Sequence, residues 1–309
     1  MRTAIIADVH GNAPALAAVL ADAAAQNVDR YILLGDYIFD MPFGNEVVDL
    51  MRAIPNAYSI AGNKEGYLDW LTGEEEDCKQ LNSLYQTYRE LSEENRAYLR
   101  GLPKELRIPS AHGEICAVHS INIDYYAHWT TYSSGVSYRM RGNPMPREEY
   151  LRYYTEVFQT EEAIANITDY GAKIVLFGHN HLQGHCLCGD VLVINPGSCG
   201  SPQDGDNRAA YSILDEDTLQ VEERRAAYDI EAAIHAAKAT KTYAVADIFL
   251  ELVFQTLREG FECFMRMFKL ADSIRDAKGG EGYPYTNEVW EEAYATYQQE
   301  QQSLKENQQ

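Results

Sequence analysis

Short, largely apolar segments alternate with longer amphipathic segments along the first third of the chain. The short segments are typical of buried strands, and the longer ones have the apolar spacing of helices. The expected order is strand, helix, strand, helix, strand: Thr3–Ala7, Asn12–Gln26, Arg30–Leu34, Gly44–Ala53 and Ala57–Ala61. This βαβαβ order predicts a parallel sheet with right-handed crossovers.

The next part of the chain interrupts this alternation. Residues 64–101 are charged and rich in Tyr and Leu, which predicts two helices that form a cap insertion beside the strand ends. Paired strands are expected at Leu106–Pro109 and Glu114–Val118, around a turn. Residues 121–146 are dense in Tyr and irregular in pattern, and we expect a loop that folds over the strand ends.

The remaining chain predicts further strands and then only helices. Arg147–Tyr170 is predicted to be helical, followed by a strand over Lys173–Phe177. Antiparallel pairing of four short strands would complete a second sheet: Gly184–Cys188, Val191–Ile194, Ala210–Asp215 and Leu219–Arg224. Residues 229–309 read as helical, with a last helix over Asn287–Gln302. The apolar stripe of Thr242–Lys278 must be buried, either against the sheets or between two subunits of a homo-oligomer.

Composition narrows the classes of partner. The 309 residues include 26 basic and 47 acidic residues, for a net charge of −21. This balance argues against a nucleic-acid surface and against an anionic membrane, and it favours a small phosphorylated substrate only where bound cations reverse the local field. The six cysteines form no CxxC pair, and Met1 leads directly into the first strand, so we expect a cytoplasmic protein without a signal peptide. The apolar run Val245–Leu257 is too short and too charged to span a bilayer.

Polar side chains follow the ends of several predicted strands. In open α/β sheets, ligands bind beyond the carboxyl ends of the strands. The candidate ligands are Asp8, His10, Asp36, Asn63, His119, His179 and His181. Carboxylate, amide and imidazole ligands suit Mn, Fe or Zn, and seven groups exceed the need of one ion but suit two. Asp36 is the natural bridging ligand, because its strand lies between the others.

Each of these residues also has an ordinary structural explanation. Asp36 could be a turn residue, Asn63 a helix cap and His119 a hydrogen-bonded interior histidine. These separate explanations do not account for the order in which the motifs recur along the chain.

The ordered motifs resemble those of the calcineurin-like metallophosphoesterases, in particular the branch of small bacterial phosphodiesterases and diadenosine tetraphosphatase-like proteins. The motifs are Asp8-Val9-His10, Gly35-Asp36, Gly62-Asn63, His119 and Gly178-His179-Asn180-His181. The resemblance covers roughly residues 1–228 and implies an α/β fold, a two-sheet sandwich flanked by helices. The helical cap 64–101 would be an insertion in this domain, and 229–309 would be a helical extension.

The resemblance also implies an activity and a division of ligands between two ions. Asp8, His10, Asp36 and His181 would hold the first ion, and Asp36, Asn63, His119 and His179 the second, with Mn favoured. A hydroxide that bridges the ions would attack phosphorus in line and hydrolyse a phosphate ester or anhydride. Two other hypotheses remain open: a metal-bound scaffold protein with little turnover, and, less favoured by the charge, a nuclease.

The sequence departs from the family at Lys64, where many relatives have His, Asp or Cys. Lys64 could bind a phosphate oxygen, or it could pair with Glu65 or Asp69 and point away from the site. Catalytic roles are therefore predicted for Asp36, Asn63, His119 and Lys64. Substrate contacts are predicted for Asn12, Tyr125, His128 and Arg139, because aromatic rings could stack on a base and Arg could bind a second phosphate.

Overall fold

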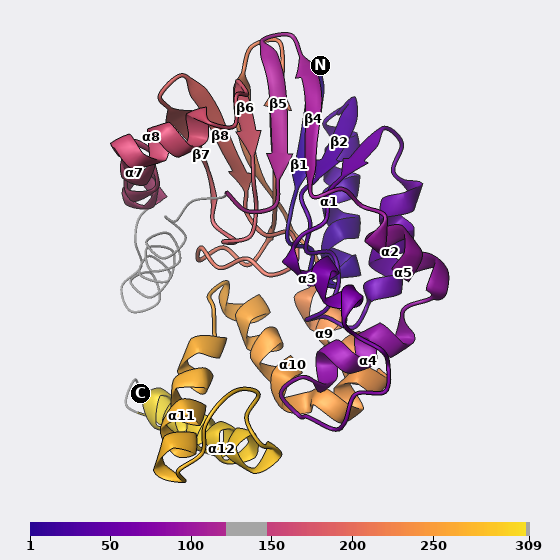
Figure 1. Ribbon diagram of the computed structural model, residues 1–309, viewed down its shortest axis with the longest axis vertical. Helices are drawn as coiled ribbons and strands as arrows, with labels where there is room; N and C mark the ends of the chain where they lie inside the picture. Colours follow the sequence, from indigo (N-terminus) through magenta and orange to yellow (C-terminus); the bar gives the residue numbers. More distant parts are fainter. Residues whose placement is uncertain (122–146, 307–309) are drawn as a thin grey trace.

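Two five-stranded sheets are the centre of the computed structural model, which describes residues 1–121 and 147–306 (Figure 1). The first sheet has the order β10-β9-β1-β2-β3, from β1 (Arg2–Ile6), β2 (Arg30–Leu33), β3 (Ala57–Ser59), β9 (Ala209–Asp215) and β10 (Gln220–Ala226). The second has the order β4-β5-β6-β8-β7, from β4 (Glu105–Ser110), β5 (Gly113–Val118), β6 (Ile174–Leu176), β7 (Gln183–Cys188) and β8 (Val191–Pro196). The predicted two-sheet α/β sandwich is confirmed.

Parallel strands form the middle of each sheet. In the first sheet β1, β2 and β3 are parallel, and in the second β5, β6 and β8 are parallel. The prediction that the four short C-terminal strands complete the second sheet is only half right. β7 joins that sheet beside β8, but β9 pairs antiparallel with β1 of the first sheet, and β10 follows beside β9. The local pattern gives hairpins, but it does not specify which sheet edge a hairpin joins.

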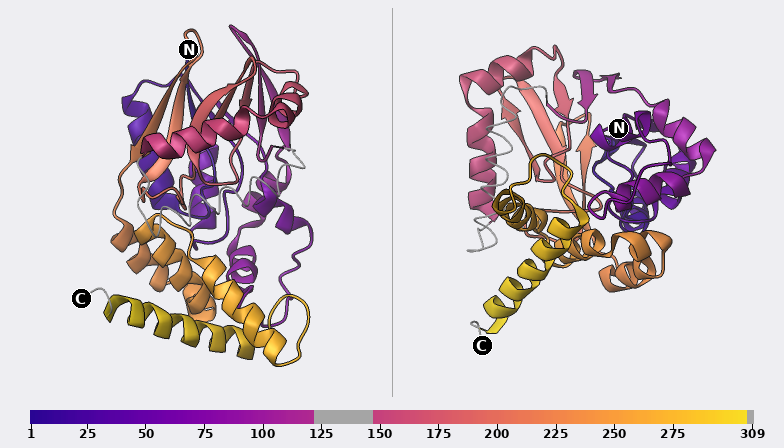
Figure 2. Two further views of the ribbon diagram at one scale, coloured as in Figure 1. Left: turned by 90° about the vertical axis from the view of Figure 1, so that its left-hand side faces the viewer. Right: turned by 60° about the horizontal axis from the view of Figure 1, so that its bottom comes forward.

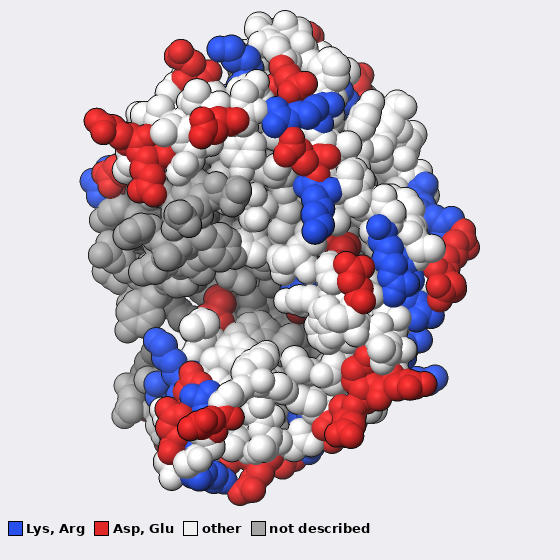
Figure 3. Space-filling view, viewed as in Figure 1, with Lys and Arg blue, Asp and Glu red and all other residues white. Residues whose placement is uncertain are grey.

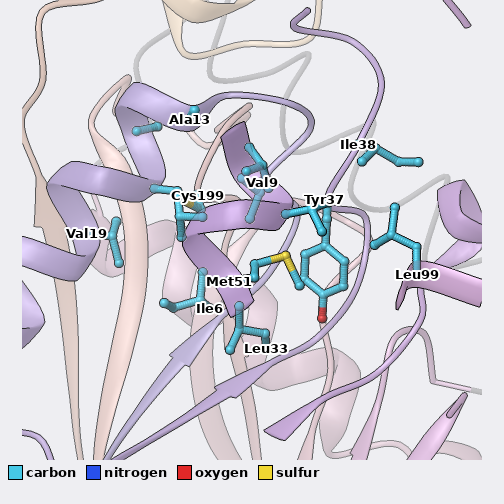
Figure 4. Packing of buried hydrophobic residues seen from close by; sticks show 14 of the residues in the cluster. Ile6, Val9, Ala13, Val19, Leu33, Tyr37, Ile38, Met51, Leu99 and Cys199 are labelled. Atoms are coloured by element: carbon cyan, nitrogen blue, oxygen red, sulfur yellow. The ribbon is translucent and has the colours of Figure 1, made fainter. Parts of the chain in front are cut away.

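The strand β1 shows how side chains divide between two cores. Ile5 contributes to the layer between the sheets, whereas Ala4 and Ile6 face the helices outside the first sheet. Successive residues of a strand point to opposite faces, so an uninterrupted apolar run is buried on both sides. Figure 4 shows the outer core, in which Ile6 and Leu33 lie near Met51 and the ring of Tyr37.

Helices cover the outer face of each sheet. α1 (Ala13–Ala25) and α2 (Gly44–Ala53) lie against the first sheet, and α7 (Arg147–Phe158) and α8 (Glu161–Thr168) lie against the second (Figure 1). The predicted helical segment Arg147–Tyr170 is confirmed, and it contains two helices. The Thr160 side chain accepts a hydrogen bond from the N–H of Ala163 at 3.2 Å and so begins a new helix there.

The helical segments 64–101 and 229–306 pack together at the end where the parallel strands terminate (Figure 2). The first contains α3 (Asn63–Gly66), a 3₁₀ turn η1 (Tyr67–Asp69), α4 (Asn82–Glu90) and α5 (Glu93–Arg100). The second contains α9 (Ile230–Lys238), α10 (Lys241–Glu259), α11 (Phe264–Ala277) and α12 (Asn287–Glu306). Asn82 Nδ2 donates to Val245 O at 3.0 Å, and Lys79 N–H donates to Asn287 Oδ1 at 2.8 Å.

The predicted apolar stripe of Thr242–Lys278 is divided between two helices, because Gly260 ends α10 in a left-handed conformation with φ 69°. Leu250 and Val253 are buried with α9 and with Met41, a residue of the loop that follows Asp36. Ile248 and Leu252 are buried against α11 and α12. Among the described helices, none is both long and apolar enough to cross a membrane.

Candidate metal centre

The seven candidate ligands all follow carboxyl ends of parallel strands. Asp8 and His10 follow β1, Asp36 follows β2 and Asn63 begins α3 after β3, whereas His119 follows β5, and His179 and His181 follow β6. These strand ends lie at the same end of the two sheets, above the C-terminal helices (Figure 1). In the view of Figure 3 the surface is hollowed between the sheets and those helices.

The ligand atoms gather in two groups. Asp8, His10 and His181 form one group, and Asp36, His119 and His179 form the other; within each group the atoms lie within 4.8 Å of one another. The two Nε2 atoms of His10 and His181 are 3.0 Å apart. His119 Nε2 lies 3.2 Å from His179 Nδ1 and 3.0 Å from Asn63 Oδ1, so Asn63 joins the second group.

Asp36 faces both groups. Its Oδ1 lies 3.4 Å from His119 Nε2, and its Oδ2 lies 4.0 Å from His10 Nε2. The two oxygens of one buried carboxylate are thus directed toward two separate sets of donors. This is the geometry that a bridging ligand needs.

Three imidazole rings are oriented by acceptors behind them. His119 Nδ1 lies 2.7 Å from Leu34 O, His181 Nδ1 lies 2.7 Å from Ser201 O, and His10 Nδ1 lies 2.7 Å from a carboxylate oxygen of Asp40. An acceptor at Nδ1 fixes the hydrogen on that atom and leaves the lone pair of Nε2 directed into the site. In the first group His10 Nε2 and His181 Nε2 lie 3.0 Å apart, so a cation between them would accept the lone pairs of both rings. The residues present therefore fit divalent metal ions.

Burial shifts the ionisation of several of these groups. Burial raises the pKa of Asp8 to about 6. Burial, followed by the charge of His119, lowers the pKa of His179 to about 4, and burial also lowers the pKa of His181 well below its ordinary value. The rings of His179 and His181 are therefore neutral at neutral pH, which is the state in which imidazole binds metal.

Strained backbone is concentrated at the candidate ligands. Five of the seven have φ between 51° and 72°, in the left-handed region: Asp8, His10, Asp36, His179 and His181. Non-glycine residues seldom adopt this conformation, and such strain is typical of functional sites. Hydrogen bonds between the loops hold it, since Asp8 N–H donates to Gly35 O at 3.1 Å and His10 N–H donates to Asp36 O at 2.9 Å.

Two glycines of the motifs are required by close approach. A Cβ on Gly62 would lie 2.3 Å from Asp36 Oδ1, and a Cβ on Gly178 would lie 2.7 Å from Asp8 Oδ2. Any larger residue at either position would displace a candidate ligand carboxylate. The glycines that precede Asn63 and His179 thus have a steric reason.

Glu65 is a residue whose role the sequence reasoning missed. Its buried carboxylate accepts hydrogen bonds from the N–H groups of Asp36 at 2.9 Å, Tyr37 at 2.9 Å and Gly62 at 2.8 Å. It therefore joins the loop after β2 to the loop after β3. The sequence shows an acidic residue two positions after Asn63, but the pattern there suggests only an ion pair with Lys64.

Lys64 pairs with neither residue suggested by the sequence. Its Nζ lies 3.3 Å from Asp40 Oδ1, and the other oxygen of Asp40 is the one beside His10 Nδ1. Burial alone would lower the pKa of Lys64, but the carboxylates of Asp40 and then Asp36 outweigh burial and raise that pKa. Asp40, which the motifs did not indicate, thus connects the first ligand group to the one lysine predicted to act on substrate.

Of the four residues predicted to contact substrate, only Asn12 lies within the described residues. The Asn12 side chain accepts from Ala15 N–H at 3.2 Å and donates to Gly200 O at 3.0 Å and Tyr228 Oη at 2.9 Å. These bonds favour a structural role for Asn12, as the N-cap of α1. Tyr125, His128 and Arg139 lie outside the described residues.

Comparison with known proteins agrees with this geometry. The sequence model of the family described as calcineurin-like phosphoesterase matches residues 1–183. An uncharacterised protein of Methanocaldococcus jannaschii, MJ0912, is 28% identical over 255 residues, which is 74% of this chain and 89% of the relative.

Two solved structures share the fold. A metallophosphoesterase from Sphaerobacter thermophilus has a TM-score of 0.60 and 24% identity, over 84% of this chain and 99% of that one. The hypothetical protein PH1004 from Pyrococcus horikoshii has a TM-score of 0.62 and 19% identity, over 82% of this chain and 97% of that one. At this level of sequence identity, the similarity shows a shared fold alone.

Proposed function

The chain belongs to the calcineurin-like phosphoesterase family and is a metal-dependent phosphoesterase, and from this premise we propose that it hydrolyses a phosphate ester or anhydride at a centre of two divalent ions. One observation carries the proposal. The carboxylate of Asp36 directs one oxygen toward His119 at 3.4 Å and the other toward His10 at 4.0 Å. A single ion does not require a carboxylate shared between two groups of donors.

The proposed ligand sets follow from the two groups. Asp8, His10 and His181 would hold one ion, Asn63, His119 and His179 the other, and Asp36 both. Ions bound there would neutralise phosphoryl oxygens and lower the pKa of a bound water. Imidazoles, carboxylates and an amide without a thiolate suit Mn, Fe or Zn, and we favour Mn.

The protein's own residues would position the substrate. Lys64 is a point charge beside Asp40, whose other oxygen faces His10 of the first group, and from there it can hold a phosphoryl oxygen. Its raised pKa makes it a poor proton donor at neutral pH. We therefore propose a substrate whose leaving group departs without strong acid assistance, such as a diester, an anhydride or an aryl ester. A small molecule fits the net charge of −21 better than nucleic acid does.

Replacement of Asp36 tests the proposal. With Mn²⁺ added, the wild-type protein is expected to hydrolyse bis(p-nitrophenyl) phosphate or p-nitrophenyl phosphate, and Asp36→Asn to lose activity by at least about 100-fold. The matched control is Asp169→Asn, at an exposed carboxylate at the end of α8, which should leave the rate unchanged.

Bound metal, measured by elemental analysis, should fall in Asp36→Asn while the circular dichroism spectrum stays that of the wild type. Absence of turnover in the wild type, or activity of Asp36→Asn within twofold of it, would contradict the proposal.

A further inference from the structure

Aromatic side chains form a continuous series that leads away from the candidate metal centre. Lys64 Nζ lies 5.9 Å from the centre of the Tyr67 ring. The Tyr67 ring lies 6.0 Å from that of Phe39 and 5.7 Å from that of Trp70. Phe39 is buried, so the series begins beside the ligand loops and continues outward along η1.

The outer member of this series is exposed. Trp70, which directly follows η1, is 53% exposed. We name Tyr67 and Trp70 the aromatic shelf; both residues belong to the cap insertion.

Packing within the protein does not explain the exposed part of the shelf. The N–H groups of Trp70 and Leu71 both donate to Tyr67 O, at 3.3 and 3.2 Å, so these hydrogen bonds of the turn use the backbone and not the indole ring. A large aromatic side chain that is half exposed forgoes much of the stabilisation that burial would give. A single exposed apolar residue is ordinary on a protein surface. Here the exposed aromatic residue belongs to a series of rings that begins beside the candidate metal centre, which indicates a binding surface.

We propose that the aromatic shelf binds a planar aromatic ring carried by the substrate, so that the substrate class is a small nucleotide-like or aryl phosphate. The inference rests on the proposed function, because the phosphoryl group must lie beside Lys64 for the ring to reach Tyr67. A neutral ring can bind by stacking, and stacking does not oppose the acidic field of a protein with net charge −21. The ring would thus add binding free energy to the contacts that the ions and Lys64 make with the phosphoryl group.

The test compares two ligands that differ in the ring alone. We expect AMP to bind the Mn²⁺-loaded protein about tenfold more tightly than ribose 5-phosphate, as stacking of one base on an aromatic side chain predicts. Trp70→Leu should remove most of this difference and leave ribose 5-phosphate binding unchanged, whereas Trp70→Phe should keep it. Tyr58→Leu is the matched control, because Tyr58 is an exposed aromatic residue on β3, 42% exposed and outside the shelf. Titration calorimetry measures all four proteins, and an assay for released phosphate identifies any titration in which the ligand is hydrolysed.

The outcomes separate this inference from the proposed function. Equal binding of AMP and ribose 5-phosphate by the wild type, or an unchanged ratio in Trp70→Leu, would overturn the aromatic subsite even if bis(p-nitrophenyl) phosphate is hydrolysed. A preference for AMP that depends on Trp70 would support the subsite even if no ester is hydrolysed. Phenyl phosphate tests which rings the shelf accepts. If phenyl phosphate and AMP both bind more tightly than ribose 5-phosphate, the shelf recognises aromatic rings in general. If only AMP binds more tightly, the shelf recognises a nucleobase.

Discussion

Replacement of Glu65 with Gln would test whether one buried carboxylate holds two ligand loops in register. Oε2 accepts from the N–H groups of Asp36 and Gly62, at 2.9 and 2.8 Å, and Oε1 accepts from Tyr37 N–H at 2.9 Å. A glutamine has one oxygen, so at best it keeps the two bonds of Oε2 and turns its NH₂ toward the N–H of Tyr37. The Tyr37 N–H and the buried NH₂ of the glutamine then both lack an acceptor, and the two remaining bonds are no longer charge-assisted. With a cost of about 1–3 kcal/mol for an unsatisfied buried group, and weaker bonds besides, we expect a loss of about 2–4 kcal/mol in the free energy of unfolding.

Urea denaturation followed by circular dichroism measures this loss, and calorimetry with Mn²⁺ measures its effect on the site. Because the backbone of Asp36 moves when its N–H loses a charged acceptor, Mn²⁺ affinity should fall together with stability. Glu76→Gln is the control, because Glu76 is exposed. The free energy of unfolding of this variant should differ from that of the wild type by less than about 0.5 kcal/mol. If Glu65→Gln unfolds within that same margin of the wild type and binds Mn²⁺ as tightly, the role assigned to Glu65 is refuted.

Three further predictions follow from the same loops. Asp40→Asn removes the charged acceptor from His10 Nδ1 and should weaken Mn²⁺ binding by about 10- to 100-fold, measured by calorimetry; unchanged affinity would contradict this. Gly62→Ala should abolish Mn²⁺ binding because its Cβ would lie 2.3 Å from Asp36 Oδ1, whereas Gly66→Ala, with no atom within 4 Å, should be neutral or stabilising by up to about 1 kcal/mol in urea denaturation. Removal of divalent ions with EDTA should lower the melting temperature, since an ion at 100 times its Kd stabilises by about 2.7 kcal/mol; an unchanged melting temperature would argue against bound ions.

The residues that follow the strand ends could be predicted from the sequence, because the apolar pattern of each strand is a local feature. The apolar segment that contains Ile5 and the one that contains Ile32 have the pattern of strands buried on both faces. Parallel strands that share an edge bring the residues that follow them together, so Asp8 and Asp36 could be placed near each other without knowledge of the tertiary structure.

Other features depend on contacts that no local pattern encodes. The pairing of β9 with β1 joins segments about two hundred residues apart. Glu65 accepts a hydrogen bond from the backbone of Asp36 in another loop, and Asp40 lies beside the ring of His10. These roles appear only when the strands are assembled. Asn12 is different, because Asn directly before Ala13 and Pro14 is an N-cap signal in the sequence itself, and the structure shows that cap in place of the predicted substrate contact.

The most direct test of the proposed two-ion centre is an anomalous diffraction map of crystals grown with Mn²⁺. We predict two manganese peaks. One should be coordinated by Asp8, His10 and His181, the other by Asn63, His119 and His179, and each peak should be in contact with one oxygen of Asp36. A single peak, or two peaks that do not share Asp36, would contradict the account.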